Sequence, residues 1–551
     1  MTVSSATPLD DLRAALLDSA AELRSDPSAL STAPTLERPP RAELGDYSTN
    51  AAMLLAPVLK AAPRAIAERL GSGLDARMGD RLDRVEVAGP GFLNVFLTDA
   101  WYVESAASVL AAGEEYGAGR PERSERINVE FVSANPTGPL TAASGRHAAY
   151  GDSLSRILEL AGHSVDREYY FNDSGTQVRK LGESIRARAL GGPVPAGGYE
   201  GDYVVELAAA IPGAGDKSPD LDRLSREGVE RMFARIRRTL ETYRVSFDRF
   251  FLENSLYEGE PTAVERAYAR LEERGHLYRH EGALWLRTSD FGDDKDRVLE
   301  RSTGDPTYFA SDVAYLEHKL ERGYDRLVYV LGSDHHGYIG RMRAAAAALG
   351  VEPRRLEIPI LQFVHIVEGG QRASMSKRRG DFITLDELVE EIGVDATRFF
   401  MLGRSHDSTV DLDLDLARRQ SNENPVYYVQ YAHARIASVL ARAGQARVEQ
   451  ALLESARAEG LTLERAEREL IKKLLAFPGE VAEAADRRAP HRIAAYALEL
   501  AQAFTAFYRD CQVVGVEPVE LKSFRIALSV VSQRVIARSL GLLGVDAPAS
   551  M

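Results

Sequence analysis

The chain has 551 residues, which is too long for one hydrophobic core, so we expect three or four domains. Its composition, 45% hydrophobic and 27% charged residues, is ordinary for a soluble globular enzyme. The single cysteine, Cys511, excludes an intramolecular disulfide and argues against a structural zinc site. Without a signal peptide or a run of about 18 apolar residues, we expect a cytoplasmic protein that does not enter a membrane.

The charge is unevenly distributed along the chain. The net charge is −14, yet residues 411–551 carry 18 Lys and Arg against 18 Asp and Glu, so the acidic excess precedes them. Because phosphate contacts dominate nucleic-acid affinity, this acidity argues against nonspecific DNA binding. It argues less against a shaped RNA partner, which a locally basic face can bind.

The first part of the chain predicts a small α/β domain. LDDLRAALLDSAAELR has apolar residues at helical spacing, and RLDRVEVAGPGFLNVFL predicts two strands joined by a turn. Between them, GDYSTNAAMLLAPVLK predicts a helix capped by Ser48 or Thr49. We place this domain at residues 1–118, ahead of the linker-like GAGRPERSER.

The second domain is predicted over residues 119–410. INVEFVS, a helix over about residues 145–162, and DREYYFND alternate strand and helix, and RLVYVLGSD and LEIPILQFVHIVEG add further strands. This alternation predicts a Rossmann-like parallel sheet with crossover helices. A glycine-rich and charged stretch over about residues 179–301 predicts an insertion into that fold. Residues 411–551 are helical throughout and predict an all-α bundle, which makes the chain an α/β multidomain protein.

Two segments of the second domain have the chemistry of a phosphate site. Ile127–Asp152 places a strand, a tight turn and a helix that starts with small residues in direct succession. Such a helix start binds anions through its free N–H groups and its dipole. The basic loop RASMSKRRGDF, Arg372–Phe382, follows the strand IPILQFVHI and is expected at the same sheet edge. Either segment alone could be an ordinary helix start or a solvated loop that binds no phosphate. Two such segments that converge predict a nucleotide-binding site.

Together these motifs resemble the class I aminoacyl-tRNA synthetases. SMSKR is similar to their Lys-Met-Ser-Lys signature, with Ser374 in place of the first lysine and Lys377 matching the second. EFVSANPTGPL, REYYFNDSG and LGSDHHGYIGRM are similar specifically to the arginyl-tRNA synthetases. GDYSTNAA and AGPGFLN resemble their N-terminal tRNA-binding domain, and PVYYVQYAHARI resembles their helical anticodon-binding domain. The likeness spans nearly the whole chain.

The resemblance implies an arginine–tRNA ligase that activates L-arginine with ATP and Mg²⁺ and charges the terminal adenosine of tRNA-Arg. A monomer is expected. The implied catalytic residues are those of the basic loop, Ser376, Lys377 and Arg378. The implied ATP contacts are Pro139, Thr141, Ser144, Gly145, Arg146, Met375, Ser376 and Lys377. The implied tRNA contacts are Tyr47, Asn50, Tyr427, Gln430, Tyr431 and Arg435. The tyrosines of residues 425–436 could equally be core residues.

The arginine site has a physical argument of its own. A guanidinium needs carboxylates in a planar arrangement with hydroxyl neighbours. Tyr308 and Asp312 are four residues apart, so on a helix they share one face, and the resemblance makes them guanidinium ligands. It adds Glu130, Asn135 and His336 to the arginine site. His335 and His336 have no third ligand nearby in sequence, so no metal site is expected.

The chain departs from the family at one signature. The His-x-Gly-His motif would fall at residues 141–144, which here are Thr-Ala-Ala-Ser. Losing one transition-state donor of this kind typically slows a reaction by about 10²–10³-fold. The hydroxyls of Thr141 and Ser144 could recover part of this, and so could His147 if the helix turns it inward rather than to the surface.

Two other hypotheses stay open, and only the first of them is favoured by the missing histidines. A non-catalytic tRNA-binding paralogue would bind tRNA without aminoacylating it. A nucleotidylyltransferase would share the phosphate signatures but would not need residues 411–551.

Overall fold

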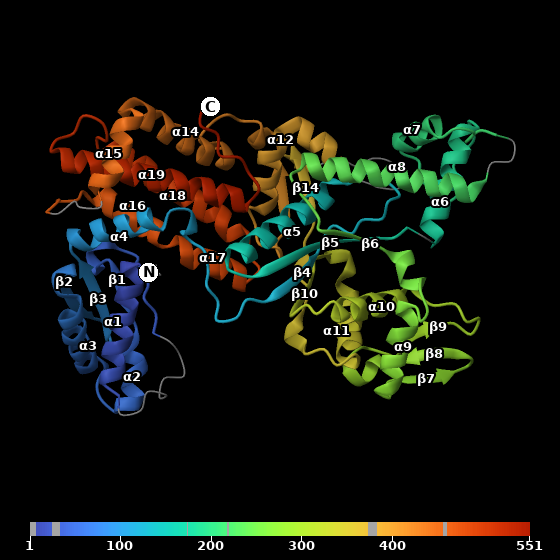
Figure 1. The fold of residues 1–551 in the computed structure, drawn as a ribbon, viewed down its shortest axis with the longest axis horizontal. Coiled ribbons are helices and arrows are strands. Elements are labelled where there is room, and N and C mark those ends of the chain that lie inside the picture. The colour runs from blue at the N-terminus through green and yellow to red at the C-terminus, as the bar shows by residue number, and fades with distance from the viewer. Residues whose placement is uncertain (1–6, 25–33, 174, 217–219, 373–382, 456–459) are drawn as a thin grey trace.

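The structure is a computed structural model that describes residues 7–24, 34–173, 175–216, 220–372, 383–455 and 460–551. Figure 1 shows an N-terminal α/β unit, a central sheet with its helices, and a C-terminal group of helices. The predicted fold class is therefore confirmed.

The N-terminal unit is a three-stranded antiparallel sheet covered by helices. Its strands, in the order β1-β3-β2, are β1 (Tyr47–Thr49), β3 (Phe92–Leu97) and β2 (Leu82–Ala88). Its helices are α1 (Pro8–Glu22), α2 (Ala51–Leu59), α3 (Pro63–Met78) and α4 (Asp99–Ala112). The predicted caps of α2, Ser48 and Thr49, belong instead to β1, and Asn50 precedes the helix without a side-chain cap bond. Both residues pair with Asn94 and Leu93 of β3, but Thr49 Oγ1 still accepts from the N–H of Ala51, the first residue of α2, at 3.2 Å.

The central sheet consists of five parallel strands in the order β12-β10-β4-β5-β6. They are β12 (Leu356–Glu357), β10 (Arg326–Tyr329), β4 (Arg126–Glu130), β5 (Ser164–Phe171) and β6 (Arg249–Leu252). The crossover helices are α5 (Ala142–Leu160), α10 (Tyr308–Glu321) and α11 (Ile339–Ala348). In such open sheets the crevice beyond the carboxyl ends of the strands is the usual place for ligands. A short parallel pair, β11 (Leu331–Gly332) and β13 (Ile360–Leu361), extends this edge.

The stretch predicted as an insertion also supplies a strand to the main sheet. It contains α6 (Gly175–Ala189), α7 (Asp202–Ala210), α8 (Leu221–Thr242), α9 (Ala263–Glu273) and the antiparallel strands β7 (Leu277–His280), β8 (Ala283–Leu286) and β9 (Arg297–Glu300). Between α8 and α9, however, β6 pairs with β5 as the edge of the central sheet. A four-residue strand inside a charged, helical stretch gives too short a pattern to be found from sequence.

The chain beyond the central sheet returns to the start of α5. Strand β14 (Val364–Glu368) pairs with β15 (Gln371–Arg372) and β16 (Val410–Asp413) in a separate sheet, not in the main one. Helix α12 (Leu385–Leu402) then begins next to α5, where Ala142 N–H donates to the Ile383 carbonyl at 3.1 Å. The Leu385 N–H likewise donates to the Leu140 carbonyl at 2.8 Å. The far flank of the basic loop therefore lies against the start of α5.

The C-terminal part is helical, and its last residues pack against the catalytic part. Its helices are α13 (Leu414–Ala417), α14 (Pro425–Ala443), α15 (Gln445–Ser455), α16 (Arg465–Leu475), α17 (Phe477–Asp486), α18 (His491–Asp510) and α19 (Val519–Leu542). Arg398 of α12 is fully buried and donates to Asp152 of α5 at 2.5 Å. Its other guanidinium nitrogens donate to the carbonyls of Leu543 and Tyr243, at 2.7 and 2.9 Å. One buried guanidinium thus joins α5, α12 and the ends of α8 and α19.

Candidate active site

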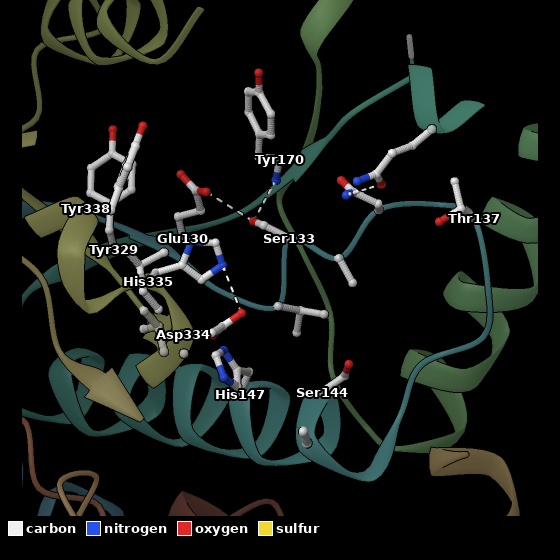
Figure 2. A pocket seen from close by; sticks show the side chains of 18 of the residues that line it. Glu130, Ser133, Thr137, Ser144, His147, Tyr170, Tyr329, Asp334, His335 and Tyr338 are labelled. Carbon is white, nitrogen blue, oxygen red and sulfur yellow. Dashed lines mark hydrogen bonds and ion pairs between the residues drawn. The ribbon is translucent and has the colours of Figure 1, made fainter. Parts of the chain in front are cut away.

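A cavity of about 830 Å³ opens beyond the carboxyl ends of β4 and β10, above the start of α5. Figure 2 shows labelled side chains from α5 on one side of it and tyrosines with Glu130 on another. Four of the predicted site residues line its wall: Glu130, Asn135, Ser144 and Asp312. The wall also includes Thr137, Ala143, His147, Tyr170, Gln177, Lys180, Tyr315, Tyr329, Asp334, His335 and Tyr338. Residues far apart in sequence therefore meet at one crevice, as the strand order requires.

The start of α5 forms the floor of the cavity. Thr141 precedes the helix and accepts a hydrogen bond from the Ser144 N–H at 3.3 Å, while the Ser144 hydroxyl accepts one from the Thr141 N–H at 3.4 Å. This reciprocal capping fixes the first turn. The N–H groups of Thr141, Ala142 and Ser144 all have partners, so the Ala143 N–H and the helix dipole remain for an anion at the cavity. Ser144 itself lines the cavity, so the capping side chain also offers its hydroxyl to a ligand there.

Gly145 and Arg146, both predicted to contact ATP, have packing contacts instead. A Cβ at Gly145 would lie 2.7 Å from Cδ1 of Leu385, so glycine permits α12 to approach α5. Arg146 is buried, and its guanidinium donates to the carbonyls of Gln362, Ser405 and Ser408 at 2.6–2.8 Å. Neither residue lines the cavity. Both residues therefore hold packed segments together beneath the site.

His147 lies in the cavity wall, not on the outer surface of the helix. It is three residues after Ser144, which places both on one helix face. Burial lowers the pKa of His147 to about 4, so the imidazole is neutral at physiological pH. One ring nitrogen hydrogen-bonds the Val330 carbonyl, so in the neutral ring the other nitrogen is an acceptor.

Glu130 is buried at the end of β4 and is already paired. Its Oε2 accepts from the Lys319 ammonium at 2.6 Å, and its Oε1 accepts from the Ser133 hydroxyl at 3.1 Å. Lys319 is itself completely buried, so the pair has no net charge toward the cavity. Val132 and Ser133 turn the chain away from the strand with φ of 66° and 39°, a left-handed conformation that side chains seldom adopt. This strained turn places Glu130 and Ser133 at the cavity.

Asp312 lines the cavity and has no cationic hydrogen-bond partner among the described residues, whereas Glu130 is paired with Lys319. Burial of the carboxyl raises the pKa of Asp312 to about 7, although a hydrogen bond with Tyr338 acts in the opposite direction. Glu253 and Glu130 add to the rise through their negative charge. The charge of Arg341 lowers this pKa, but no ion pair joins it to Asp312 in the described residues, so an entering guanidinium would be the first cation bonded to this carboxyl.

The other predicted arginine contacts are placed differently from one another. The Asn135 amide donates to Gln177 Oε1 at 2.7 Å and lines the cavity. Tyr308 begins α10 and is 62% exposed, outside the cavity wall. His336 lies in the short 3-10 helix Ser333–Tyr338, but its side chain lies outside the described part of the structure. The neighbouring His335 faces the cavity rim, 3.5 Å from Asp334.

Sequence reasoning missed the contribution of α6 to the cavity. Gln177, Lys180 and the nearby Tyr199 line it, and Lys180 brings a positive charge to the wall. Lys180 and Tyr199 belong to the stretch interpreted as an insertion and Gln177 lies just before it, and no motif pointed to them. The predicted basic-loop residues Met375, Ser376, Lys377 and Arg378 lie outside the described residues, as do Ser374 and Arg379. The two flanks of that loop, at Arg372 and Ile383, are described.

Comparison with known proteins agrees with this arrangement. Residues 10–97 match the arginyl tRNA synthetase N-terminal domain, residues 216–417 the class I (R) tRNA synthetase catalytic domain, and residues 429–551 the DALR anticodon-binding domain. The chain is 46% identical over 557 residues to the arginine–tRNA ligase of Kineococcus radiotolerans, covering 98% of this chain and 99% of the relative. The chain belongs to the arginyl-tRNA synthetase family.

Other relatives of this synthetase support the assignment. It is 44% identical over 529 residues to the arginine–tRNA ligase of Shouchella clausii, covering 94% of each chain. The arginyl-tRNA synthetase structure from Thermus thermophilus has a TM-score of 0.76 at 24% identity, covering 98% of this chain and 99% of that one, which shows the shared fold. A non-catalytic paralogue and a nucleotidylyltransferase are not favoured, because curated relatives of near-full length are arginine–tRNA ligases.

The residues of the synthetase predicted to contact tRNA fall into two groups. Tyr427 and Tyr431 of α14 stack with ring centroids 6.0 Å apart, and Arg435 lies over the Tyr431 ring at 4.6 Å. Tyr431 is 36% exposed, so this stack reaches the surface. Gln430 is buried and donates to Asp395 at 2.7 Å and to the Asp546 carbonyl at 2.9 Å.

The predicted tRNA contacts of the N-terminal unit of the synthetase have internal partners. Tyr47 is buried, its ring edge against Trp101 at 6.1 Å, and Asn50 Oδ1 accepts from the Thr35 N–H at 2.9 Å. Tyr47 therefore belongs to the core of this unit.

Within the residues that the structure describes, no helix is long and apolar enough to cross a membrane. Nor do they bring three His, Cys, Asp or Glu side chains together as metal ligands.

Proposed function

We propose a place for each substrate of this synthetase, which is a class I arginine–tRNA ligase. The observation that carries the proposal is that one cavity joins the N-terminal end of α5 to Asp312, an acid without a cationic hydrogen-bond partner among the described residues. The first suits the phosphates of ATP and the second suits the guanidinium of arginine. The reacting carboxylate and α-phosphate would meet between them.

ATP binds, in this proposal, across the start of α5 as its Mg²⁺ complex. The Ala143 N–H and the Ser144 hydroxyl are proposed to face the phosphates. We propose the same for Lys377, Arg378 and Ser376 of the basic loop, because Ile383 and Leu385, just beyond that loop, hydrogen-bond the α5 start. Their positive charge would stabilise the charge that grows on the leaving pyrophosphate. Pro139, Thr141 and Met375 complete this part of the site as proposed neighbours.

His147 is proposed to contact the nucleoside part of ATP. With one ring nitrogen on the Val330 carbonyl, the other offers a lone pair, which suits a ribose hydroxyl or the adenine amino group better than a phosphate. Replacing His147 with alanine should therefore raise KM for ATP about two- to tenfold, the range of one neutral hydrogen bond, and leave KM for arginine unchanged. Equal rises in both constants would contradict this role.

Arginine is proposed to bind with its guanidinium at Asp312 and with Asn135 at the cavity wall. Glu130, already neutralised by Lys319, acts on arginine indirectly by holding Ser133 and the turn at the end of β4. The arginine carboxylate attacks the α-phosphorus, the bond to pyrophosphate breaks, and arginyl-adenylate forms. No side-chain base is needed, because the nucleophile is already ionised. A hydroxyl of the terminal adenosine of tRNA then takes the arginyl group, and AMP leaves.

The C-terminal helices are proposed to bind the anticodon. The stack of Tyr427 and Tyr431 with Arg435 offers aromatic and cationic faces to unpaired bases. We also propose that the enzyme is a cytoplasmic monomer. Light scattering of the purified chain would measure its oligomeric state.

The test of the arginine site is the exchange Asp312→Asn. The variant keeps the shape of the side chain but cannot become an anion, so we expect KM for arginine to rise by roughly tenfold to a hundredfold while KM for ATP stays constant. The control is Asp290→Asn on the exposed part of the inserted stretch, which should leave both constants unchanged. Steady-state aminoacylation of tRNA-Arg measures all three chains, and an unchanged KM for arginine in Asp312→Asn would refute the site.

A further inference from the structure

Tyr329, the last residue of β10, has an unsatisfied hydroxyl at the wall of the cavity. The residue is 6% exposed, and its hydroxyl is buried with no hydrogen-bond partner among the described residues. Figure 2 shows it beside Tyr338 and close to Glu130. Burying a hydroxyl without a partner costs stability, so such groups are rare and need an explanation.

The neighbouring tyrosines do not share this feature. Tyr315, on the facing helix α10, donates to Glu168 at 2.5 Å. Tyr169 donates to the Ala134 carbonyl at 2.8 Å, and Tyr324 donates to Asp166 at 2.6 Å. The unsatisfied hydroxyl is therefore a property of the position of Tyr329 and not of tyrosines in this sheet generally.

The charges around Tyr329 indicate which ligand suits it. The Lys319 ammonium lies 3.9 Å from its ring centroid, but Glu130 already neutralises that cation. Burial first, and then the negative charges of Glu130, Glu168 and Asp312, raise the pKa of Tyr329, so the phenol stays neutral. A neutral hydroxyl near the unpaired acid Asp312 is an acceptor for a cation that enters with N–H groups.

We propose that the Tyr329 hydroxyl contacts the arginine substrate by accepting a hydrogen bond from one N–H of its guanidinium. The inference rests on the proposed arginine site at Asp312. A guanidinium carries five N–H donors, and the two oxygens of Asp312 leave donors that require another acceptor. Tyr329 meets this need and is relieved of its own unsatisfied hydroxyl at the same time. The unsatisfied hydroxyl therefore destabilises the free enzyme, and arginine binding removes this destabilisation. This favours a substrate with many N–H donors.

The experiment compares Tyr329→Phe with Tyr315→Phe in the full chain. Tyr329→Phe removes no bond of the free enzyme, so its melting temperature without arginine should equal or exceed that of the parent chain. Its KM for arginine should rise about ten- to a hundredfold, with an unchanged KM for ATP and a smaller rise in melting temperature on adding arginine. Tyr315→Phe loses its bond to Glu168 and should instead melt at a lower temperature without arginine.

Asp312→Asn, measured in the same series, separates the two proposals. If Asp312→Asn raises KM for arginine while Tyr329→Phe leaves it unchanged, the arginine site stands and the role of Tyr329 is overturned. The role of Tyr329 is overturned as well if Tyr329→Phe lowers the melting temperature as Tyr315→Phe does, with unaltered arginine kinetics, because the hydroxyl then has a structural partner such as a trapped water. If Asp312→Asn leaves arginine use intact, the arginine site itself is wrong, and the inference falls with it.

Discussion

In the proposed arginine site, Asp312 couples substrate binding to a proton. Burial of its carboxyl raises the pKa to about 7 in the free enzyme, so near neutral pH a large fraction is protonated. A guanidinium binds the ionised form, which opposite charge stabilises, and the pKa falls when arginine enters. Arginine binding near neutral pH therefore releases protons.

This coupling gives arginine use a defined pH dependence. Above pH 7 Asp312 is ionised and KM for arginine should be constant, whereas below pH 7 the binding form is lost as protons are taken up. We expect KM for arginine to be about tenfold higher at pH 6 than at pH 8. Aminoacylation kinetics at several pH values measure this, with KM for ATP as the internal reference. A KM for arginine that stays level across this range would contradict the assignment.

Single residues differ in how well their roles follow from sequence. The i, i+4 spacing of Tyr308 and Asp312 led to Asp312, yet the same pattern did not separate the cavity residue from its exposed neighbour. Arg146 could not be interpreted locally, because its carbonyl partners belong to residues more than 200 positions away. No sequence pattern pointed to Tyr329, because it lies in an apolar strand and a missing hydrogen-bond partner cannot be recognised from sequence.

Helix α5 depends on the hydroxyl pair at its start. Thr141 and Ser144, which the resemblance aligns with the signature histidines, cap the helix here. The sequence Thr-x-x-Ser therefore lacks histidine side chains for the phosphates but fixes the first turn through its cap. The fixed turn keeps its N–H groups in place. On this view the helix itself provides most of the anion site.

Replacing Thr141 with alanine tests that view. The lost cap should destabilise the protein by about 1 kcal/mol and should also raise KM for ATP, because a frayed first turn presents its N–H groups poorly. Thr262→Ala is the matched control, since Thr262 caps α9 in the same way but lies outside the cavity wall. It should lower stability and leave KM for ATP unchanged. Thermal unfolding and ATP kinetics provide the two readouts, and identical kinetics for both variants would refute a role for the cap.

Elements were predictable where their pattern was long. The strands at β4, β5 and β10, the helix at α5 and the helical C-terminal part all followed from periodicity. β6 did not, because four residues carry too little pattern and its partner strand is far away in sequence. LEIPILQFVHIVEG suggested one strand, but it divides into β12, β13 and β14 in three different sheets, a choice made by tertiary pairing.

At the scale of the whole molecule, Arg398 holds catalytic and C-terminal parts together. It is buried with Asp152, and its remaining nitrogens satisfy carbonyls at the ends of α8 and α19. Asp395 adds to this joint by accepting from Gln430 and from the Asp546 N–H. Helix α5 therefore meets the anticodon-binding part at Asp152 while its first turn lies in the active site.

Arg398→Leu should weaken this joint strongly. It removes the donor of two buried carbonyls and one partner of Asp152, which keeps Arg156 at 2.9 Å and Arg167 at 3.9 Å. We expect a loss of about 3 kcal/mol, the lower end for breaking a buried pair, because Arg156 remains. Unfolding followed by circular dichroism measures it, with Arg509→Ala on the exposed surface as a control that should not shift the midpoint. A midpoint unchanged in Arg398→Leu would show that the joint contributes nothing.

The order of the central strands has a consequence for the synthesis of this protein. β4 lies between β5, which follows it closely, and β10, whose Arg326 pairs with Ile127 about 200 residues later. At roughly 5–20 residues per second, a growing chain waits about 10–40 seconds with the hydrogen-bonding edge of β4 open. An open apolar edge is a template for unwanted pairing between chains. We expect ribosome pausing between residues 252 and 326 to favour aggregation, and slow codons or chaperone binding there to govern the yield of active enzyme.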